Sequence, residues 1–329
     1  MALELDELAA IARRYERFAT SEARASSPTY EQLALAIAES AELLAFLSSV
    51  PSGRRQPNLF LAAIRHVSGV PRDGNEMEVI VRTHAPRIRE MMLSRTTQTN
   101  EPARCAVLLP VLAGLSQPLA LLEVGASAGL CLLPDRYGYD YGGHRIDPPS
   151  SGPAGAPIFR CVASAATPLP LALPKIGWRC GLDLNPLDVN APAEMAWLET
   201  LVWPDQGHRV KNLRAAIDIA RIDPPRVRSG DLLADFPAIA ALSPKEMQLV
   251  VYHTAVLGYV GSRSDRDGFA KAVRQTGAVW ISNEAPSVFP ELTRAAPSPP
   301  GPGHFLLAID GRPVAWTAPH GQSINWFAS

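Results

Sequence analysis

Cysteine and net charge are both scarce in this chain. Its four cysteines, Cys105, Cys131, Cys161 and Cys180, form no CxxC pair, and no histidine cluster stands beside them. This spacing excludes the usual zinc motifs, so we predict no metal site and expect free thiols in a reducing compartment. The formal net charge is only -1. Without a basic excess, we expect no general electrostatic binding of nucleic acid.

Long apolar runs are lacking as well. The most apolar stretch, residues 249–260, contains His253 and Thr254, and a run of about a dozen residues is too short to span a bilayer. The first residues contain neither a basic region nor a long apolar region, so we expect no signal peptide. We therefore expect a cytoplasmic protein with no membrane association.

The first third of the chain has the pattern of helices. Leu8, Ile11 and Tyr15 recur at steps of three and four, which places them on one helix face. Ser27-Pro28 is a typical helix start, with a capping serine before a proline at the first helical position. Apolar residues within 58–67 and 86–93 recur at the same steps of three and four. We predict a helical N-terminal domain or cap over residues 1–115.

From residue 116 onward, strand-like and helical segments alternate. The predicted strands are 119–124, 178–184, 227–231, 248–252 and 278–283, and the predicted helices are 193–203, 206–222 and 264–276. Alternation of this kind predicts an α/β fold with a Rossmann-like, mostly parallel sheet. Asp310-Gly311 between two apolar runs predicts an antiparallel C-terminal hairpin. We assign 116–329 to this domain, with an insert at about 134–176.

The sharpest motif is a glycine turn that follows the first strand. Glu123 ends the strand, and Gly125, Ala126, Ser127 and Gly129 follow it. Small residues allow a ligand to approach the backbone, and a helix beginning there would offer free N–H groups. The pattern suits S-adenosylmethionine (SAM), with an acidic residue ending the next strand, here Asp183, on the ribose hydroxyls. A turn-capping role before Asn185-Pro186 is the alternative for Asp183.

Other interpretations of the glycine turn remain open. Gly-Ala-Ser-Ala-Gly is formally the G-x-S-x-G nucleophile elbow of a serine hydrolase, with Ser127 exposed. The helical segment before the strand, the charge of Glu123 and the lack of an upstream oxyanion loop count against it. The spacing departs from the dinucleotide motif G-x-G-x-x-G. A glycine turn that binds no ligand is the remaining alternative.

Five blocks of the sequence together resemble the DUF2332 proteins, an uncharacterised bacterial family. They are Glu-Val-Gly-Ala-Ser-Ala-Gly-Leu (123–130), Asp-Arg-Tyr-Gly-Tyr-Asp-Tyr-Gly (135–142), Gly-Leu-Asp-Leu-Asn-Pro-Leu-Asp (181–188), Leu-Val-Trp-Pro-Asp-Gln (201–206) and Ser-Asn-Glu (282–284). The resemblance implies a class I SAM-dependent methyltransferase-like fold and SAM as cofactor. Asp183 stands much further from the glycine turn than the roughly twenty residues of compact folds, so the chain must carry an insertion there.

The same resemblance extends the predicted site to later strand ends. Asp231 and Leu232 follow a short strand at the place that lies by the adenine in folds of this type; capping of the next helix is the alternative for Asp231. His253 ends the fourth strand, where a neutral imidazole could take a proton from the methyl acceptor. Asn283 and Glu284 end the fifth strand and are candidate substrate-binding residues.

Three tyrosines of the insert share one face of a strand or hairpin. Tyr137, Tyr139 and Tyr141 alternate with other residues. They form either an aromatic wall over the ligand or the packing surface of the insert. Trp203-Pro204-Asp205-Gln206 receives no role from the sequence.

These observations predict a SAM-dependent methyltransferase, while its acceptor, a small molecule or a protein, is not identified. A SAM-fold protein that binds without turnover is the first alternative. A serine hydrolase acting through Ser127 is the second. The N-terminal helices suit either a substrate lid or a homodimer interface.

Overall fold

The computed structural model describes residues 2–153 and 155–328 and shows two compact units. The helical unit comprises Met1–Thr99 and Ala193–Lys211, and the sheet unit comprises Asn100–Pro192 and Asn212–Ser329. The helical unit thus ends before residue 115 and takes in a second segment of chain. The apolar helix at 105–113 belongs to the sheet unit because all but its last residue is buried there.

The helical unit consists of helices and the turns between them. They are α1 (Ala2–Phe18), continued by the π-helical turn η1 (Ala19–Ala23), α2 (Pro28–Glu39), α3 (Ala41–Ser48), η2 (Ser52–Arg54), α4 (Pro57–Ser68), α5 (Gly74–Ser94), α7 (Pro192–Thr200) and the first residues of α8 (Gly207–Ile222). The predicted helix start is confirmed, because Ser27 Oγ accepts the N–H of Tyr30 at 3.2 Å and Pro28 opens α2.

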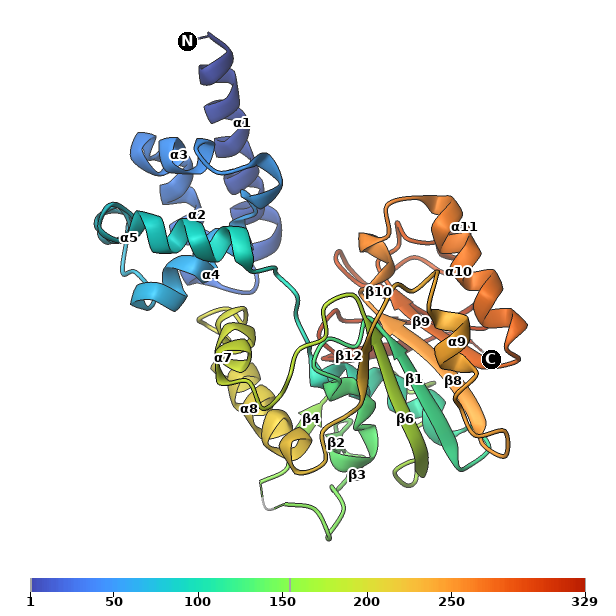
Figure 1. Cartoon of the computed structure of the whole chain (residues 1–329). Helices are drawn as coiled ribbons and strands as arrows, with labels where there is room; N and C mark the ends of the chain where they lie inside the picture. Colours follow the sequence, from blue (N-terminus) through green and yellow to red (C-terminus); the bar gives the residue numbers. More distant parts are fainter. Residues whose placement is uncertain (1, 154, 329) are drawn as a thin grey trace. The chain divides into compact units, whose positions relative to one another are not determined.

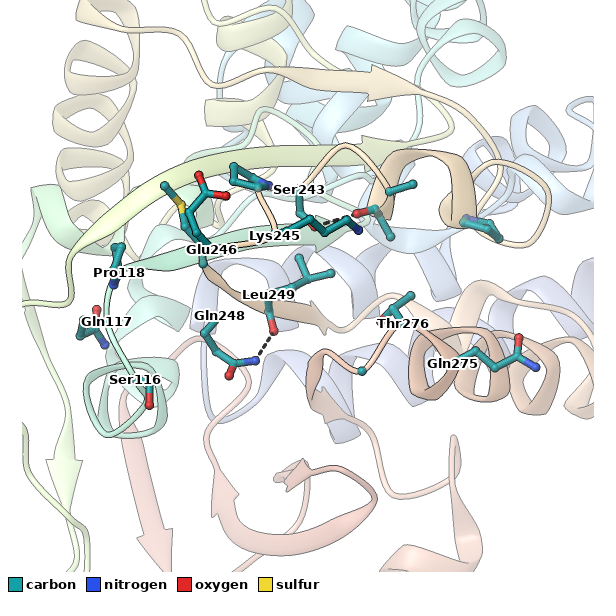
Figure 2. A pocket seen from close by; sticks show the side chains of 16 residues that line it. Ser116, Gln117, Pro118, Ser243, Lys245, Glu246, Gln248, Leu249, Gln275 and Thr276 are labelled. Carbon is teal, nitrogen blue, oxygen red and sulfur yellow. Dashed lines mark hydrogen bonds between the residues drawn. The ribbon is translucent and has the colours of Figure 1, made fainter.

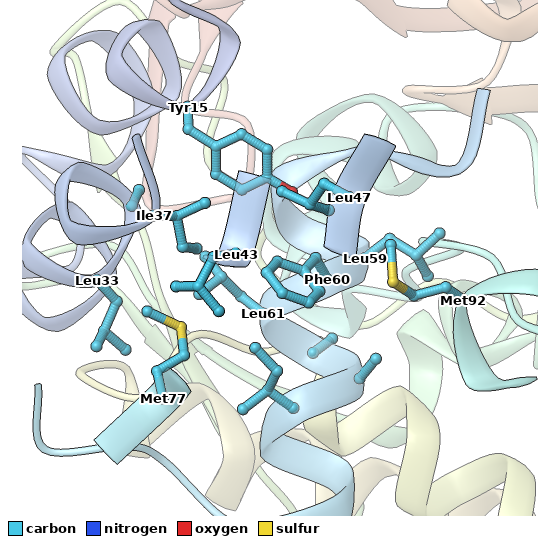
Figure 3. Close-up of a cluster of buried hydrophobic side chains, with 14 of the residues drawn as sticks. Tyr15, Leu33, Ile37, Leu43, Leu47, Leu59, Phe60, Leu61, Met77 and Met92 are labelled. Atoms are coloured by element: carbon cyan, nitrogen blue, oxygen red, sulfur yellow. The ribbon is translucent and has the colours of Figure 1, made fainter. Parts of the chain in front are cut away.

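The core of the helical unit is a continuous apolar cluster that α1 to α5 share with α7 (Figure 3). Tyr15 of α1 and Phe60 of α4 meet edge to face in it, with ring centroids 6.4 Å apart. Trp197 of α7 is buried in the same cluster, and its indole N–H donates to the carbonyl of Thr96 at 2.9 Å. The segment after residue 192 therefore supplies part of this core, which explains its place in the helical unit.

The segment 203–206, to which the sequence assigned no role, packs onto this core through Trp203. Trp203 packs against the rings of Phe18 and Tyr30, and its indole N–H donates to Asn58 Oδ1 at 2.9 Å. Asp205 accepts hydrogen bonds from the start of α2: the hydroxyl of Ser27, and the N–H and hydroxyl of Thr29 at 3.2 and 2.9 Å. The motif thus fastens this second segment onto the N-terminal helices.

The sheet unit contains one large sheet and one small one. The large sheet has the order β5-β12-β11-β10-β9-β8-β1-β6-β7, and the small one β3-β2-β4. The strands are β1 (Leu119–Val124), β2 (Gly138–Asp140), β3 (Arg145–Ile146), β4 (Ile158–Arg160), β5 (Val162–Ala163), β6 (Ile176–Asp183), β7 (Val227–Ser229), β8 (Gln248–Thr254), β9 (Val279–Glu284), β10 (Phe305–Ile309), β11 (Arg312–Thr317) and β12 (Ser323–Trp326). Their helices are η3 (Pro102–Arg104), α6 (Cys105–Ala113), η4 (Leu130–Leu132), η5 (Pro134–Arg136), the end of α8, α9 (Phe236–Ala240), η6 (Leu257–Tyr259), α10 (Arg263–Gln275) and α11 (Pro290–Ala295).

Five parallel strands form the centre of the large sheet, and Figure 1 shows β6, β1 and β8 side by side. Numbered as they occur along the chain, β1, β6, β7, β8 and β9 lie in the order 3-2-1-4-5. This is the order of a Rossmann-like fold, and its direction of winding reverses between β1 and β8. The predicted parallel α/β sheet is confirmed. Ligands of such folds bind beyond the carboxyl ends of the strands at this switch point.

The C-terminal strands add an antiparallel edge. β10 pairs antiparallel with both β9 and β11, and Asp310 and Gly311 form the predicted tight turn between them. β12 and β5 extend this edge, and the rest of the insert forms the small sheet. One face of the central strands packs against α9 and α10 through an apolar cluster that includes Phe236 and Phe269.

Candidate functional site

The glycine turn, residues 125–129, lies at the carboxyl end of β1, next to the end of β6. Its backbone is fixed by β6, because the N–H of Gly125 donates to the carbonyl of Leu182 at 2.7 Å. Asp183 Oδ2 accepts the N–H of Ser127 at 2.8 Å, and its Oδ1 accepts that of Asn185. The structure therefore brings the predicted acidic residue of the second strand directly onto the glycine turn, despite the long insertion between them.

The helix expected after the glycine turn does not form. The turn leads instead into η4, a single turn of 3-10 helix over Leu130–Leu132, and then into the insert. The N–H of Leu130 donates to Asn100 Oδ1 at 2.9 Å, so a side chain already uses this donor. The prediction of a helix N-terminus with free N–H groups is wrong, because the chain turns into the small sheet at this point.

Glu123 and Ser127 carry unused hydrogen-bonding atoms at this turn. Glu123 is 2% exposed, and its Oε2 has no hydrogen-bond partner among the described residues; the same is true of the buried Ser127 Oγ. Burial raises the pKa of the Glu123 carboxyl well above its usual range, while the nearby Arg104 guanidinium opposes the shift. Glu123 is therefore protonated under conditions in which exposed glutamates are ionised.

The register of the strands places several polar residues on the Glu123 face of the sheet. Glu123 pairs with Gly181 and Tyr252, and residues two positions further along those strands are Asp183 and Thr254. Thr254 in turn pairs with Asn283. Since alternate residues of a strand share a face, Asp183, Glu123, Thr254 and Asn283 belong to one face near the carboxyl edge.

Two residues on this face complete its polar character. Asn283 is fully buried; its Oδ1 accepts the Thr317 hydroxyl at 2.7 Å, while its Nδ2 has no partner in the described part of the chain. The buried Arg104 donates to the carbonyls of Thr254 and Pro319 at 3.1 and 2.9 Å. Arg104 was not predicted from the sequence, because it stands just before an apolar helix and outside any motif.

His253 lies on the opposite face of the sheet, where the predicted role as a base finds no support. Its ring contacts Phe269 of α10, with centroids 5.7 Å apart. Nε2 accepts the indole N–H of Trp280 at 3.0 Å, and Nδ1 lies 2.6 Å from Glu284 Oε1. Because an indole N–H only donates, the imidazole is the neutral Nδ1–H tautomer with both nitrogens occupied. No ring nitrogen is left to accept a proton.

Glu284, predicted to bind substrate, has a structural role. Besides the imidazole, its carboxylate accepts the N–H of Val256 at 2.9 Å and that of Leu257 at 3.1 Å. The side chain is buried and lies on the same face as His253. It fixes the segment that follows β8.

Val256 covers the glycine turn. A Cβ added to Gly125 would lie 2.6 Å from Val256 Cγ1 and in contact with Cγ2 as well. The φ of Gly125 is +71°, a conformation that side chains rarely adopt. The glycine at position 125 therefore serves the close approach of a residue of this same chain, which the sequence alone did not indicate.

Asp231 and Leu232 have local roles at the end of β7. Asp231 Oδ1 accepts the N–H of Leu233 at 2.8 Å and that of Ala234 at 3.0 Å, so it stabilises the turn before α9, whose own N-cap residue is Asp235. Leu232 packs against the apolar cluster beneath α9 and α10.

The tyrosines of the insert are packing residues. The hydroxyls of Tyr137, Tyr139 and Tyr141 donate to the carbonyls of Leu130, Pro134 and Ala106 at 2.8, 2.6 and 2.7 Å, and all three rings are buried. They also contact Phe159 or one another. Of the two interpretations, the structure favours the packing surface over an aromatic wall.

A serine-hydrolase site is absent from the described residues around Ser127. Ser127 has the positive φ of 53° that suits a sharp turn, but its hydroxyl is buried and no histidine bonds to it. His253 is engaged on the other face. Within residues 2–153 and 155–328, no three His, Cys, Asp or Glu residues form a group that could hold a metal ion, and no helix is long and apolar enough to cross a membrane.

A cavity of about 630 Å³ lies at the other end of the sheet (Figure 2). Its lining includes Pro118 and Gln248, at the starts of β1 and β8, with Ser243, Lys245 and Thr276 from neighbouring loops. The Gln248 amide donates to a backbone carbonyl at 3.1 Å, and Ser243 does the same at 2.8 Å. The candidate site is therefore placed at the carboxyl edge, where polar atoms without partners gather.

The strand order and the switch point define a Rossmann-like α/β protein. Over residues 12–326 the sequence matches the family described as "Uncharacterized protein conserved in bacteria (DUF2332)", and the chain belongs to this family. No curated protein and no solved structure matches the chain significantly.

Proposed function

We propose that this protein binds SAM at the switch-point site, defined as Glu123, the glycine turn 125–129 and Asp183, and that it is a methyltransferase. The observation that carries the proposal is the meeting of two acidic strand ends with the glycine turn beside the β1–β8 switch point. Rossmann-like folds bind nucleotide-type ligands at this place, with an acidic residue on the ribose.

The residues fit a polar ligand with a cationic centre. Within the described part of the chain Glu123 Oε2 and Ser127 Oγ are buried and accept or donate no hydrogen bond, so a bound ligand could supply those bonds. A cation beside Glu123 would favour its ionised form and compensate for the cost of burial. The side chain of Val256 stands over Gly125, so the proposal requires that Val256 move when the ligand binds.

Bound SAM would supply a methyl group that its sulfonium already activates, and the protein's task is to align an acceptor with it. Asp183 braces the turn through Ser127, and its carboxylate is the acceptor that we assign to the ribose hydroxyls. Glu123 would hold the cationic part of the ligand. Since both nitrogens of His253 are occupied, we assign it no role as a base.

The occupied imidazole also favours a second candidate, a SAM-binding protein without turnover. The two candidates differ in one measurable quantity: whether SAM is converted to S-adenosylhomocysteine when acceptors are offered. Conversion supports the methyltransferase, while tight binding without conversion across small-molecule and protein acceptors supports the binding protein.

The first test is thermal unfolding with and without S-adenosylhomocysteine. Ligand at a hundred times its dissociation constant adds about 2.7 kcal/mol to the free energy of unfolding, which raises Tm by several degrees. Asp183→Asn should weaken binding by about tenfold or more, because a hydrogen bond to a charged group is lost.

A matched control is Asp310→Asn. Asp310 also accepts one backbone N–H, that of Trp280 at 2.8 Å, but at the start of β9. This variant should bind as tightly as the wild type. No rise in Tm at millimolar ligand, in the folded wild-type protein and in the Val256→Ala variant, would refute the proposed cofactor.

A further inference from the structure

Residues 255–261, which we call the strap, follow β8 and lie against the glycine turn. Ala255 begins the strap with φ of +58°, in the left-handed region that residues other than glycine rarely adopt. Val256 then stands over Gly125, where an added Cβ would lie 2.6 Å from Val256 Cγ1. Val256 thus fills the space beside the first glycine of the turn, and its side chain also packs against the apolar cluster of α9 and α10.

One buried carboxylate holds the strap in place. Glu284 accepts the N–H of Val256 through both oxygens, at 2.9 and 3.1 Å, and the N–H of Leu257 at 3.1 Å. Glu284 is itself fixed by His253, whose other nitrogen accepts from Trp280. This chain of hydrogen bonds gives a function to the polar residues on the His253 face.

The tip of the strap is exposed, whereas Leu257 is buried and Val260 packs against the apolar cluster of α9 and α10. Tyr259 is 83% exposed, a Cβ added to Gly258 would meet only Val288 at 3.9 Å, and one added to Gly261 would meet nothing within 4 Å. The segment therefore combines a conformationally unusual first residue, one hydrogen-bonded anchor and an exposed tip. These are the properties of a segment that opens locally, without unfolding of the sheet.

We infer that the strap is an autoinhibitory gate, in which Val256 closes the switch-point site and Glu284 sets how often it opens. The inference rests on the proposed ligand site. A ligand binds only the open form, so its apparent dissociation constant rises as the open fraction falls. The Trp280–His253–Glu284 hydrogen bonds thereby control affinity from the face of the sheet opposite the ligand.

The first test needs no ligand. Amide hydrogen exchange is measured at residues 256 and 257 of the full-length protein, with amides of β8 and β9 as the reference. We expect the strap amides to exchange faster than the strands, and Glu284→Gln to accelerate them by about tenfold. Exchange of the strap amides only at the rate of the strands would overturn the inference.

The second test compares Val256→Ala with Val260→Ala, the same truncation in the same segment but away from Gly125. Binding of S-adenosylhomocysteine is measured by calorimetry. If Val256→Ala raises the open fraction tenfold, the apparent dissociation constant falls by about tenfold, while Val260→Ala leaves it unchanged. Unchanged or weaker binding by Val256→Ala would overturn the gate.

The two tests separate the gate from the proposed function. If neither the wild type nor Val256→Ala binds S-adenosylhomocysteine, the proposed cofactor is refuted. The exchange measurement then decides alone whether the strap opens.

Discussion

Replacement of Glu123 by glutamine tests the electrostatics of the candidate site. Burial raises the pKa of this carboxyl well above its usual range, against the opposing effect of Arg104. In the unfolded chain the carboxyl ionises near pH 4.3 or so. Between these two pKa values the folded protein holds one proton that the unfolded chain has released.

The sign of the effect follows from this proton balance. Because the folded state binds more protons, the free energy of unfolding decreases as pH rises, by about 1.4 kcal/mol per pH unit for one proton. The contribution is complete below the unfolded pKa and is lost progressively up to the folded pKa. Glutamine has nearly the shape of the protonated carboxyl and cannot ionise. The free energy of unfolding of Glu123→Gln therefore does not decrease with pH for this reason.

Urea unfolding of both proteins from pH 5 to pH 8 measures the difference. The free energy of unfolding of the variant minus that of the wild type should increase by up to about 1.4 kcal/mol for each pH unit. Glu246→Gln, at an exposed glutamate of the same unit, is the matched control and should follow the wild type. Parallel curves for the wild type and Glu123→Gln would refute a buried, protonated Glu123.

Two further predictions concern stability. Asp205→Ala removes the acceptor of the Ser27 and Thr29 groups at the start of α2, so we expect a loss of about 1 to 2 kcal/mol in urea unfolding; an unchanged midpoint would contradict the role given to segment 203–206. Gly129→Ala places a Cβ 2.9 Å from Pro225 at a φ of +74°. We expect a loss of about 2 kcal/mol or more, measured by thermal unfolding, and a variant as stable as the wild type would show that the turn can relax.

Local patterns predicted most of the large sheet. The apolar run that ends at Val124 formed a strand because it is buried on both faces, which continuous apolar sequence indicates, and β8 is likewise buried over its last five residues. The hairpin at Asp310-Gly311 followed from the turn preference of two adjacent residues. The meeting of Asp183 with the glycine turn also followed, because neighbouring parallel strands end at the same edge.

The sequence did not predict which face of the sheet each side chain of the later strands occupies. Asn283 and Glu284 are adjacent and both polar, yet they belong to opposite faces of the sheet. A shift of one residue in register would exchange them. The assignment of His253 failed for this reason: its ring lies on the α10 face, where Trp280 and Glu284 occupy both nitrogens.

The sequence by itself determined the classes of element, the order of strands and helices, and the residues of the glycine turn, because these depend on short-range preferences and burial patterns. Only the tertiary structure decided what meets that turn. Val256 covers Gly125, Asn100 binds the N–H of Leu130, and segment 203–206 fastens the helical unit. These are contacts between residues far apart in the chain, and no local preference specifies them; packing of the folded chain does.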